Sequence, residues 1–283
     1  MNKVKVIVDS TCDLSPELYK EFDIEVIPLN VNFGEENYLD NVTLTPDELY
    51  AKVKEKKQLP SSAAASPAVI EEIFRKYIDQ GYDIVFTGIG STLSTNFQSA
   101  TIAKSAFEEN RIYLIDTKNL SSGSGLLALK AGRMAKEGVS ACEIYEKVQP
   151  LAEKLSVQFV VDTLDYLHKG GRCSGTAKIF GHLFHIHPMI KVIDGKLVVY
   201  KKPRGTLKMA SNELLNVFKE DFPNIDMENV MITHAGSSRE VADYLRAELS
   251  KMVDPKIIHE TRAGCVISTH CGYGTIGILY IKK

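Results

Sequence analysis

The feature that most constrains the fold is an alternation, in the first half of the chain, of short β-branched runs with longer segments of helical period. Strands are predicted at 3–8, 24–29, 83–88 and 111–116. Between the second and third of these, Ser66 is a predicted N-cap and Pro67 the first residue of a helix whose apolar side chains share one face. This alternation predicts βαβ units around a largely parallel sheet.

The pattern changes in the second half. Two helices, broken near Gly138, are predicted between Ser121 and Leu155, and further helices are carried by apolar positions at 207–218 and 241–252. Strands are predicted at 156–161, 188–193, 196–200, 229–234, 256–260 and 275–281. The Asp-Gly pair at 194–195 is typical of a two-residue hairpin and introduces antiparallel pairing.

These patterns predict an α/β protein of two domains. The N-terminal domain, 1–157, has a largely parallel sheet with flanking helices. The C-terminal domain, 158–283, is an α/β domain with a mixed or antiparallel sheet. The change of rhythm places the boundary near 155–160.

Composition excludes several classes of function. With 283 residues, 44% of them hydrophobic and 25% charged, the chain can bury a substantial core. The net charge of −2 and the lack of any run of five Lys or Arg argue against nucleic acid and anionic membrane surfaces as partners. Five cysteines without C-x-x-C spacing, a start lacking the pattern of a secretory signal, and the absence of a long apolar stretch predict a cytoplasmic protein without stable membrane insertion.

The segment 86–100, FTGIGSTLSTNFQSA, contains a glycine-rich turn and a cluster of four hydroxyl residues at 91, 92, 94 and 95. The hydroxyls, which include Ser91 and Ser94, precede a predicted helix, and a helix N-terminus favours a carboxylate or phosphate. Plain capping of the helix by Ser94 is the alternative. The chain contains neither a Walker A sequence nor a G-x-G-x-x-G after a strand, so no sequence motif supports nucleotide binding.

A second hydroxyl cluster, LPSSAAASP at 59–67, precedes the helix that starts at Pro67. Helix starts in a parallel α/β sheet lie at the carboxyl ends of the strands, where ligands bind. Ser61 or Ser62 and the glycine-rich turn are therefore candidates to face one pocket. An ordinary loop and cap is the alternative.

A third segment, GCVISTHCGYGTIGILYI, is interpreted as an apolar strand that runs into His270 and then a glycine-rich turn. A histidine in such a turn either binds a ligand or forms its hydrogen bonds within the loop. Together with Ser91 and either Asp9 or Asp116 it also forms a Ser-His-Asp triad on paper. A serine hydrolase acting on an acyl ester through Ser91 and His270 is thus an alternative function.

Two further segments favour ordinary structure. The histidines of HLFHIHP at 182–188, with Cys173, are spaced so that neither a helix nor a strand puts them on one face, so no metal site is predicted. The glycines at 170–171 end a predicted helix over 162–169 and leave Arg172 exposed to solvent.

Six segments, taken in order, resemble the DegV family of bacterial lipid-binding proteins. They are DSTCDL at 9–14, IPLNVNFGEENYLDN at 27–41, GIGSTLSTNFQSA at 88–100, TLDYLHKGGRCS at 163–174, KKPRGTLKMA at 201–210 and STHCGYGTIGI at 268–278. The similarity covers nearly the whole chain.

The resemblance implies a two-domain α/β fold that holds a long-chain fatty acid between the domains. Members of the family act as lipid-binding subunits of a bacterial fatty acid kinase in phospholipid metabolism, and a separate ATP-binding subunit phosphorylates the bound acid to an acyl phosphate. The chain is accordingly expected to have no catalysis and no cofactor of its own.

The resemblance also implies a set of site residues. The ligand-binding residues would be Ser61 or Ser62, Ser91, Ser94 and His270, with Arg204 near the head group. Arg172 would lie on the surface that docks the kinase. The family's T-S-Q-P is here SSAA at 61–64, which leaves open which serine contacts the carboxylate, and its L-S-G-T is here LSTN at 93–96.

Overall fold

A parallel four-stranded sheet forms the N-terminal part of the computed structural model, which describes residues 2–174, 186–236 and 239–283. Its strand order is β2-β1-β6-β7, and every neighbouring pair is parallel. The strands are β1 (Val4–Asp9), β2 (Ile24–Ile27), β6 (Asp83–Thr87) and β7 (Ile112–Ile115). The predicted parallel sheet is confirmed.

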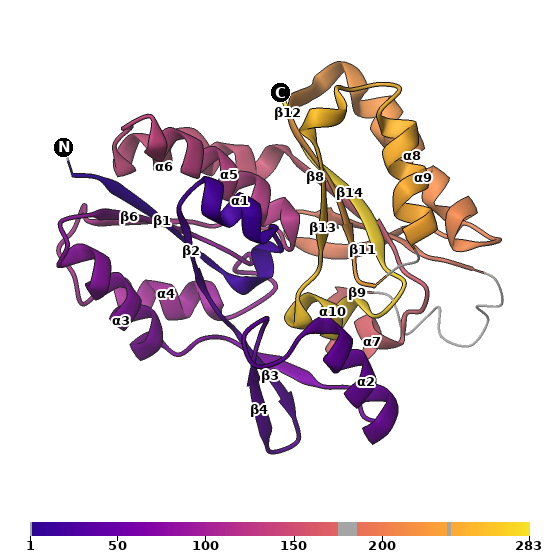
Figure 1. Cartoon of the computed structure of the whole chain (residues 1–283), viewed down its shortest axis with the longest axis horizontal. Helices are drawn as coiled ribbons and strands as arrows, with labels where there is room; N and C mark the ends of the chain where they lie inside the picture. The colour runs from indigo at the N-terminus through magenta and orange to yellow at the C-terminus, as the bar shows by residue number, and fades with distance from the viewer. Residues whose placement is uncertain (1, 175–185, 237–238) are drawn as a thin grey trace.

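Helices cover both faces of this sheet, with α5 and α6 above it and α3 and α4 below it in Figure 1. The helices of this part are α1 (Pro16–Glu21), α2 (Pro46–Lys56), α3 (Pro67–Ile78), α4 (Asn96–Lys104), α5 (Ser122–Lys136) and α6 (Ala141–Val148), with short 3-10 helices at Ser10–Cys12 and Gln149–Lys154. Ser66 caps α3 by accepting a hydrogen bond from the N–H of Val69, and Pro67 is the first helical residue, as predicted.

A small antiparallel sheet, which the sequence did not predict, lies beside the first. Its order is β4-β3-β5, with β3 (Asn30–Phe33), β4 (Glu36–Leu39) and β5 (Ser61–Ala63). These strands are three or four residues long, too short to show a clear period of two. Because successive residues of a strand point to opposite faces, β5 separates the side chains of Ser61 and Ser62.

The second half of the chain builds a mixed seven-stranded sheet in the order β13-β12-β14-β8-β10-β11-β9. Its strands are β8 (Leu155–Val160), β9 (Cys173–Ser174), β10 (Met189–Ile193), β11 (Lys196–Lys201), β12 (Ile225–His234), β13 (Ile258–Arg262) and β14 (Ile276–Lys282). Asp194 and Gly195 both have positive φ, 49° and 72°, at the tight β10–β11 hairpin. The predicted mixed sheet is confirmed, and the boundary predicted at 157/158 falls inside β8; the division into two domains stays a prediction.

Four helices accompany this sheet, α7 (Asp165–Gly170), α8 (Leu207–Asp221), α9 (Arg239–Leu249) and α10 (Cys265–Cys271), with 3-10 turns at Phe222–Asn224 and Pro255–Ile257. The prediction of a strand leading to His270 is wrong, because α10 is a helix that carries His270 in its last turn. A short apolar run with β-branched residues is compatible with a buried strand and with a buried helix. Because α10 is buried at six of its seven residues, its sequence has no polar face that would indicate a helix. Figure 1 shows the helices of the residues that the structure describes. None of them is long and apolar enough to cross a bilayer.

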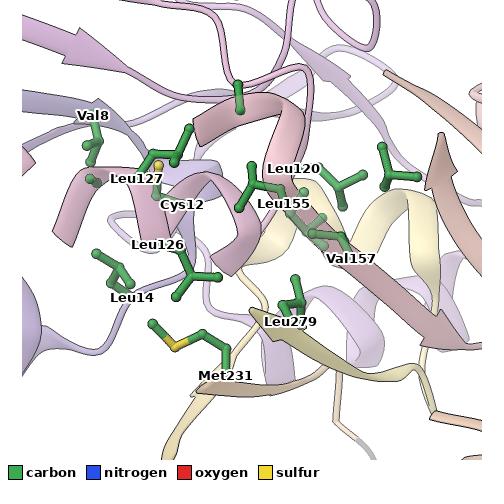
Figure 2. Close-up of a cluster of buried hydrophobic side chains, with 14 of the residues drawn as sticks. Val8, Cys12, Leu14, Leu120, Leu126, Leu127, Leu155, Val157, Met231 and Leu279 are labelled. Carbon is green, nitrogen blue, oxygen red and sulfur yellow. The ribbon is translucent and has the colours of Figure 1, made fainter. Parts of the chain in front are cut away.

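One hydrophobic core joins the two larger sheets through α5. In Figure 2, Leu126 and Leu127 of this helix lie among Val8 and Cys12 from the N-terminal part and Val157, Met231 and Leu279 from the seven-stranded sheet, and all belong to one buried cluster.

Two glycines let α5 approach both of its neighbours. A Cβ on Gly123 would lie 2.6 Å from a methyl of Val157, and a Cβ on Gly125 would lie 2.6 Å from the carbonyl oxygen of Cys12. A larger residue would push α5 away from the seven-stranded sheet at Gly123 and away from the Ser10–Cys12 turn at Gly125.

Candidate functional site

A hydrogen-bonded pair, Ser62 and His270, marks one end of an internal cavity. The Oγ of Ser62, on β5, lies 2.8 Å from Nε2 of His270, on α10, although 208 residues separate the two in sequence. The small sheet and the last helix therefore have to meet before this pair can form.

The cavity, here called the acyl cavity, has a volume of about 290 Å³. Three of its walls come from β5, the glycine-rich turn after β6 and α10. It is lined by Leu29, Ser62, Ala63, Ala64, Ile89, Leu93, Ser94, Thr95, Leu120, Arg172, Leu197, Val266, Ile267, His270 and Cys271. Most of this lining is apolar, and its hydrogen-bonding side chains are few, as is typical of a site for a largely apolar ligand.

A smaller cavity of about 30 Å³ extends the acyl cavity between the two sheets. It shares Leu120, Ile267 and Cys271 with the acyl cavity and continues toward β8, β12 and β14. Figure 2 shows two of its apolar side chains, Val157 and Leu279, near Leu120. The two cavities together provide an elongated apolar space with Ser62 and His270 at one end.

His270 is held neutral. Burial, and to a smaller extent the positive charge of Arg172, lower its pKa to about 4. Its Nδ1 is buried and has no hydrogen-bond partner among the residues that the structure describes. Gly170 packs against this atom, because a Cβ there would lie 2.3 Å from Nδ1. The position of the ring thus depends on the absence of a side chain at Gly170.

Two buried aspartates fix the start of the helix that carries His270. Asp13 accepts a hydrogen bond from the N–H of Gly264 at 2.8 Å, and Asp40 accepts one from the N–H of Cys265 at 2.6 Å. Burial raises the pKa of both carboxyls, well above its usual range for Asp13. They fill the hydrogen-bonding positions at the N-terminus of α10, so that end of the helix is not open to a ligand.

A third buried aspartate, Asp9, fixes the glycine-rich turn. It accepts hydrogen bonds from the N–H of Ile89 at 3.0 Å and from Nδ2 of Asn96 at 2.8 Å. A Cβ on Gly88 would lie 2.1 Å from its Oδ2, so the turn can approach only with glycine there. The DSTCDL segment therefore has a structural role, since it positions the two elements that form the walls of the acyl cavity.

Ser91, which the resemblance implies as a ligand-binding residue, lies outside the lining of the acyl cavity. Its Oγ donates to Oδ2 of Asp116 at 2.6 Å and its N–H to Oδ1 at 3.0 Å, and the exposed side chain does not line the acyl cavity. The cavity is lined instead by Ser94 and Thr95 of the same turn. The proposed Ser-His-Asp triad is also not assembled, because Asp116 pairs with Ser91 while the hydroxyl beside His270 belongs to Ser62.

Ser94 does not cap α4 in the expected way. Its Oγ accepts a hydrogen bond from the N–H of Asn96 at 3.2 Å, but Asn96 is already the first residue of the helix, and the N-cap residue Thr95 makes no side-chain hydrogen bond. Both hydroxyls line the acyl cavity and remain within reach of a ligand there.

The structure distinguishes the two serines that the sequence left open. Ser62 lines the acyl cavity, whereas Ser61 is exposed on the other face of β5. Arg204 is exposed, pairs in an isolated bridge with Ile186 and does not line the acyl cavity. Arg172 is exposed as predicted, yet it also lines the acyl cavity, where its Nη1 donates to the carbonyl oxygen of Gly170 at 2.6 Å.

Some contributors to the site have no signal in the sequence. The β10–β11 hairpin reaches the glycine-rich turn, where Thr92 Oγ1 donates to the carbonyl oxygen of Gly195 at 2.6 Å, and Leu197 lines the acyl cavity. Only the folded chain brings these residues together.

The histidine segment shows no metal site in the part of the chain that the structure describes. No group of three His, Cys, Asp or Glu side chains there could hold a metal ion. His187 lies 3.3 Å from Asp162, and the other two histidines of the segment, His182 and His185, are outside the described residues.

This fold and this site define an α/β protein with a largely apolar cavity whose polar end is formed by hydroxyls, a neutral histidine and Arg172. Residues 3–283 match the profile of the family described as "Uncharacterised protein, DegV family". The chain belongs to the DegV family.

Several full-length relatives support this assignment. A DegV domain-containing protein of Clostridium acetobutylicum is 34% identical over the full length of both chains. The structure of a DegV family protein from Thermus thermophilus, described as fatty acid binding, superposes with a TM-score of 0.90 at 27% identity and covers both chains completely. A stearic acid-binding protein from Eubacterium ventriosum superposes with a TM-score of 0.86 at 27% identity and covers 100% of this chain and 99% of its own.

Proposed function

We propose that this protein binds a long-chain fatty acid in the acyl cavity and presents its carboxylate to a separate ATP-binding kinase subunit. The observation that carries the proposal is the Ser62–His270 pair at the end of an apolar cavity. The fatty acids described for the Thermus thermophilus and Eubacterium ventriosum proteins support it.

The apolar lining accounts for affinity. Burying about 15 methylenes at ~0.8 kcal/mol each gives roughly 12 kcal/mol gross, of which the ordering of a flexible chain and the loss of ligand freedom cancel a large part. Burial of the tail therefore provides most of the affinity, and the contacts of the carboxylate are not needed for tight binding.

The polar end accounts for position. A buried carboxylate without partners costs several kcal/mol, so the head group has to meet donors. With the proton of His270 on Nε2, the ring donates to the Oγ of Ser62, and the hydroxyl of Ser62 is then free to donate to the carboxylate. Ser94 and Thr95 add two more hydroxyls to the same lining. These four groups are uncharged at neutral pH, and Arg172 adds a positive charge to the same lining.

Phosphorylation then requires a partner. One carboxylate oxygen forms a bond to the γ-phosphorus of ATP, the bond from that phosphorus to the bridging oxygen breaks, and ADP leaves with an acyl phosphate remaining in the cavity. The chain itself contains no Walker A or dinucleotide sequence, so we assign the nucleotide to the kinase subunit.

Mass spectrometry of the purified protein tests the proposal. Denaturing extraction should release about one fatty acid per chain, and the lipid-loaded protein alone should leave ATP unchanged. Addition of a fatty acid kinase subunit should then yield acyl phosphate. Protein without stoichiometric lipid, and unable to take up added fatty acid, would refute it.

A serine hydrolase remains the second candidate because one observation favours it. A hydroxyl 2.8 Å from an imidazole is the geometry of a nucleophile and its base, and here the nucleophile would be Ser62 rather than Ser91. Among the described residues, however, no carboxylate orients the other ring nitrogen of His270. Covalent labelling of Ser62 by a fluorophosphonate probe would favour the hydrolase.

A further inference from the structure

The side chain of His234 separates the far end of the apolar interior from an open groove. His234 is the last residue of β12 and lines the cavity of about 30 Å³, here called the end cavity, that extends the acyl cavity away from the Ser62–His270 pair. It also lines a groove of about 1030 Å³ between α1, β2 and β13, here called the back groove. No other residue of the described ranges lines both spaces.

Two other contacts complete the wall between the end cavity and the back groove, and both are hydrogen-bonded. Thr233 lines the end cavity and Thr261 the back groove, and their hydroxyl oxygens lie 2.8 Å apart. Ser121 of the end cavity donates to Oδ2 of Asp13 of the back groove at 2.5 Å. Opening the wall at either pair would leave buried polar groups without partners, which costs free energy.

The ring of His234 has no such bond in the part of the chain that the structure describes. Its Nδ1 is buried without a hydrogen-bond partner, and its Nε2 lies 3.7 Å from the carboxylate of Glu260. Burial lowers the pKa of His234, so the ring is uncharged at neutral pH and forms no ion pair with that carboxylate. The ring is therefore the part of the wall that can turn aside without breaking a hydrogen bond.

We propose that the His234 ring is a movable end wall that sets which chain lengths of fatty acid the protein accepts. A shorter acyl chain ends before the ring and leaves it in place. A longer chain turns the ring aside, and its last methylenes enter the back groove, whose lining includes the apolar side chains of Leu14 and Val26. The inference rests on the proposed function and adds a specificity-determining residue to it.

The sizes of the two spaces favour this route. The end cavity has roughly the volume of one water molecule, so an acyl chain that reaches it soon meets the wall. The back groove, at about 1030 Å³, has room for the end of a chain. Each methylene that leaves water for an apolar surface favours binding, so a chain that passes the ring gains affinity from the groove.

The test compares myristic acid with the longer arachidic acid on delipidated full-length protein, by displacement of a fluorescent fatty acid. His234→Ala removes the ring, so the affinity for arachidic acid relative to myristic acid should rise about fivefold or more. His234→Trp fills the wall with a larger ring, and the same ratio should fall about fivefold. The matched control is His259→Ala, which removes a half-buried histidine that lines neither space and should leave the ratio within about twofold.

A second measurement locates the end of the chain in the wild-type protein. Each acid is labelled with ¹³C at its terminal methyl group and bound to the protein, and a gadolinium chelate is added to the solvent. The methyl resonance of arachidic acid should broaden, because this chain end lies in the open groove. The methyl resonance of myristic acid should stay sharp, because this chain ends inside the wall.

Three results would overturn the end wall and leave the fatty acid function standing. They are an unchanged ratio in both His234 variants, an equal loss of affinity for the two acids in His234→Ala, and methyl resonances that respond alike to the chelate. Wild-type protein that binds neither acid would overturn the proposed function together with the end wall.

Discussion

The two hydroxyl-rich segments, 59–67 and 86–100, look alike in sequence and differ in the fold. Ser62 of the first is bonded to a buried neutral histidine and lines the acyl cavity. Ser91 of the second is exposed and bonded to Asp116. Both are serines near the start of a helix, so the residue type and its local position do not separate them.

Ser62 and Ser91 differ in the hydrogen-bond partner that the tertiary structure places beside each of them. Ser62 meets α10, a helix from the far end of the chain, whereas Ser91 meets an aspartate just beyond the neighbouring strand of its own sheet. An anionic partner repels a carboxylate ligand, whereas a neutral imidazole can donate to the hydroxyl of Ser62 and leave that hydroxyl free to donate to a carboxylate. The contrast predicts that substitutions around Ser62 change ligand binding and those around Ser91 do not.

Removal of the imidazole should have the largest effect. His270→Ala removes the partner that holds the hydroxyl of Ser62 toward the ligand and leaves a gap beside it, so fatty acid affinity should fall by roughly 2–3 kcal/mol, or about 30- to 150-fold. Fluorescence displacement on delipidated protein measures this. His259→Ala is the matched control, because that half-buried histidine is bonded to Asn229 and does not line the acyl cavity. Similar losses in both variants would show that His270 has no special role.

The free energy of unfolding should depend on pH because of His270. The pKa of His270 is lowered from 6.5 to about 4 in the fold, so its contribution to stability is complete above pH 6.5 and is lost as the pH falls toward 4. Between pH 7 and pH 5 the wild type should lose on the order of 2 kcal/mol more unfolding free energy than His270→Gln, which cannot titrate there. Denaturant unfolding at the two pH values checks this. Equal losses of unfolding free energy in the two proteins would show that His270 is not buried in its neutral form.

A smaller effect is expected when the ring is displaced rather than removed. Gly170→Ala places a Cβ 2.3 Å from Nδ1 of His270, which should push the ring away from Ser62 and weaken fatty acid binding about tenfold, roughly 1.4 kcal/mol.

Gly171→Ala provides the control for Gly170→Ala. Its φ of 67° makes alanine unfavourable by about 1 kcal/mol or more, but the new Cβ meets nothing within 4 Å. This variant should lose stability and keep its affinity. If the two variants bind the ligand equally, Gly170 does not position His270.

The two serines give the smallest and most specific contrast. Ser62→Ala should reduce fatty acid affinity by roughly 1 kcal/mol, about fivefold, the net value of one hydrogen bond. Ser91→Ala should stay within about 0.5 kcal/mol in affinity, because its hydroxyl satisfies Asp116 instead of a ligand. Isothermal titration of one fatty acid into the three proteins compares them directly, and a larger loss in Ser91→Ala would reverse the assignment.

The sequence predicted the main elements because their signals are local. Apart from the two-residue β9, the strands of both larger sheets and the capped helix at Pro67 follow from periodicity and from single residues such as Ser66. The helical state of α10 could not be read this way, since a buried run of seven residues satisfies both periods.

The site was predictable only in part. His270 and the serine pair were found through motifs, but the choice of Ser62 over Ser61 depends on which face of β5 turns inward. The positions of Ser91, Arg204 and Arg172 depend on tertiary contacts that no local pattern encodes. The bond between Ser91 and Asp116, which lies 25 residues further along the chain, is one such contact.

The central claim, that Ser62 rather than Ser91 contacts the carboxylate, is tested most directly by ¹³C NMR of bound palmitic acid labelled at the carboxyl carbon. Saturated complexes of the wild type, Ser62→Ala and Ser91→Ala are compared at pH 7. We expect the bound carboxyl resonance to move in Ser62→Ala, because one of its hydrogen bonds is lost, and to coincide with the wild type in Ser91→Ala. A resonance that moves in Ser91→Ala and stays in place in Ser62→Ala would contradict the account.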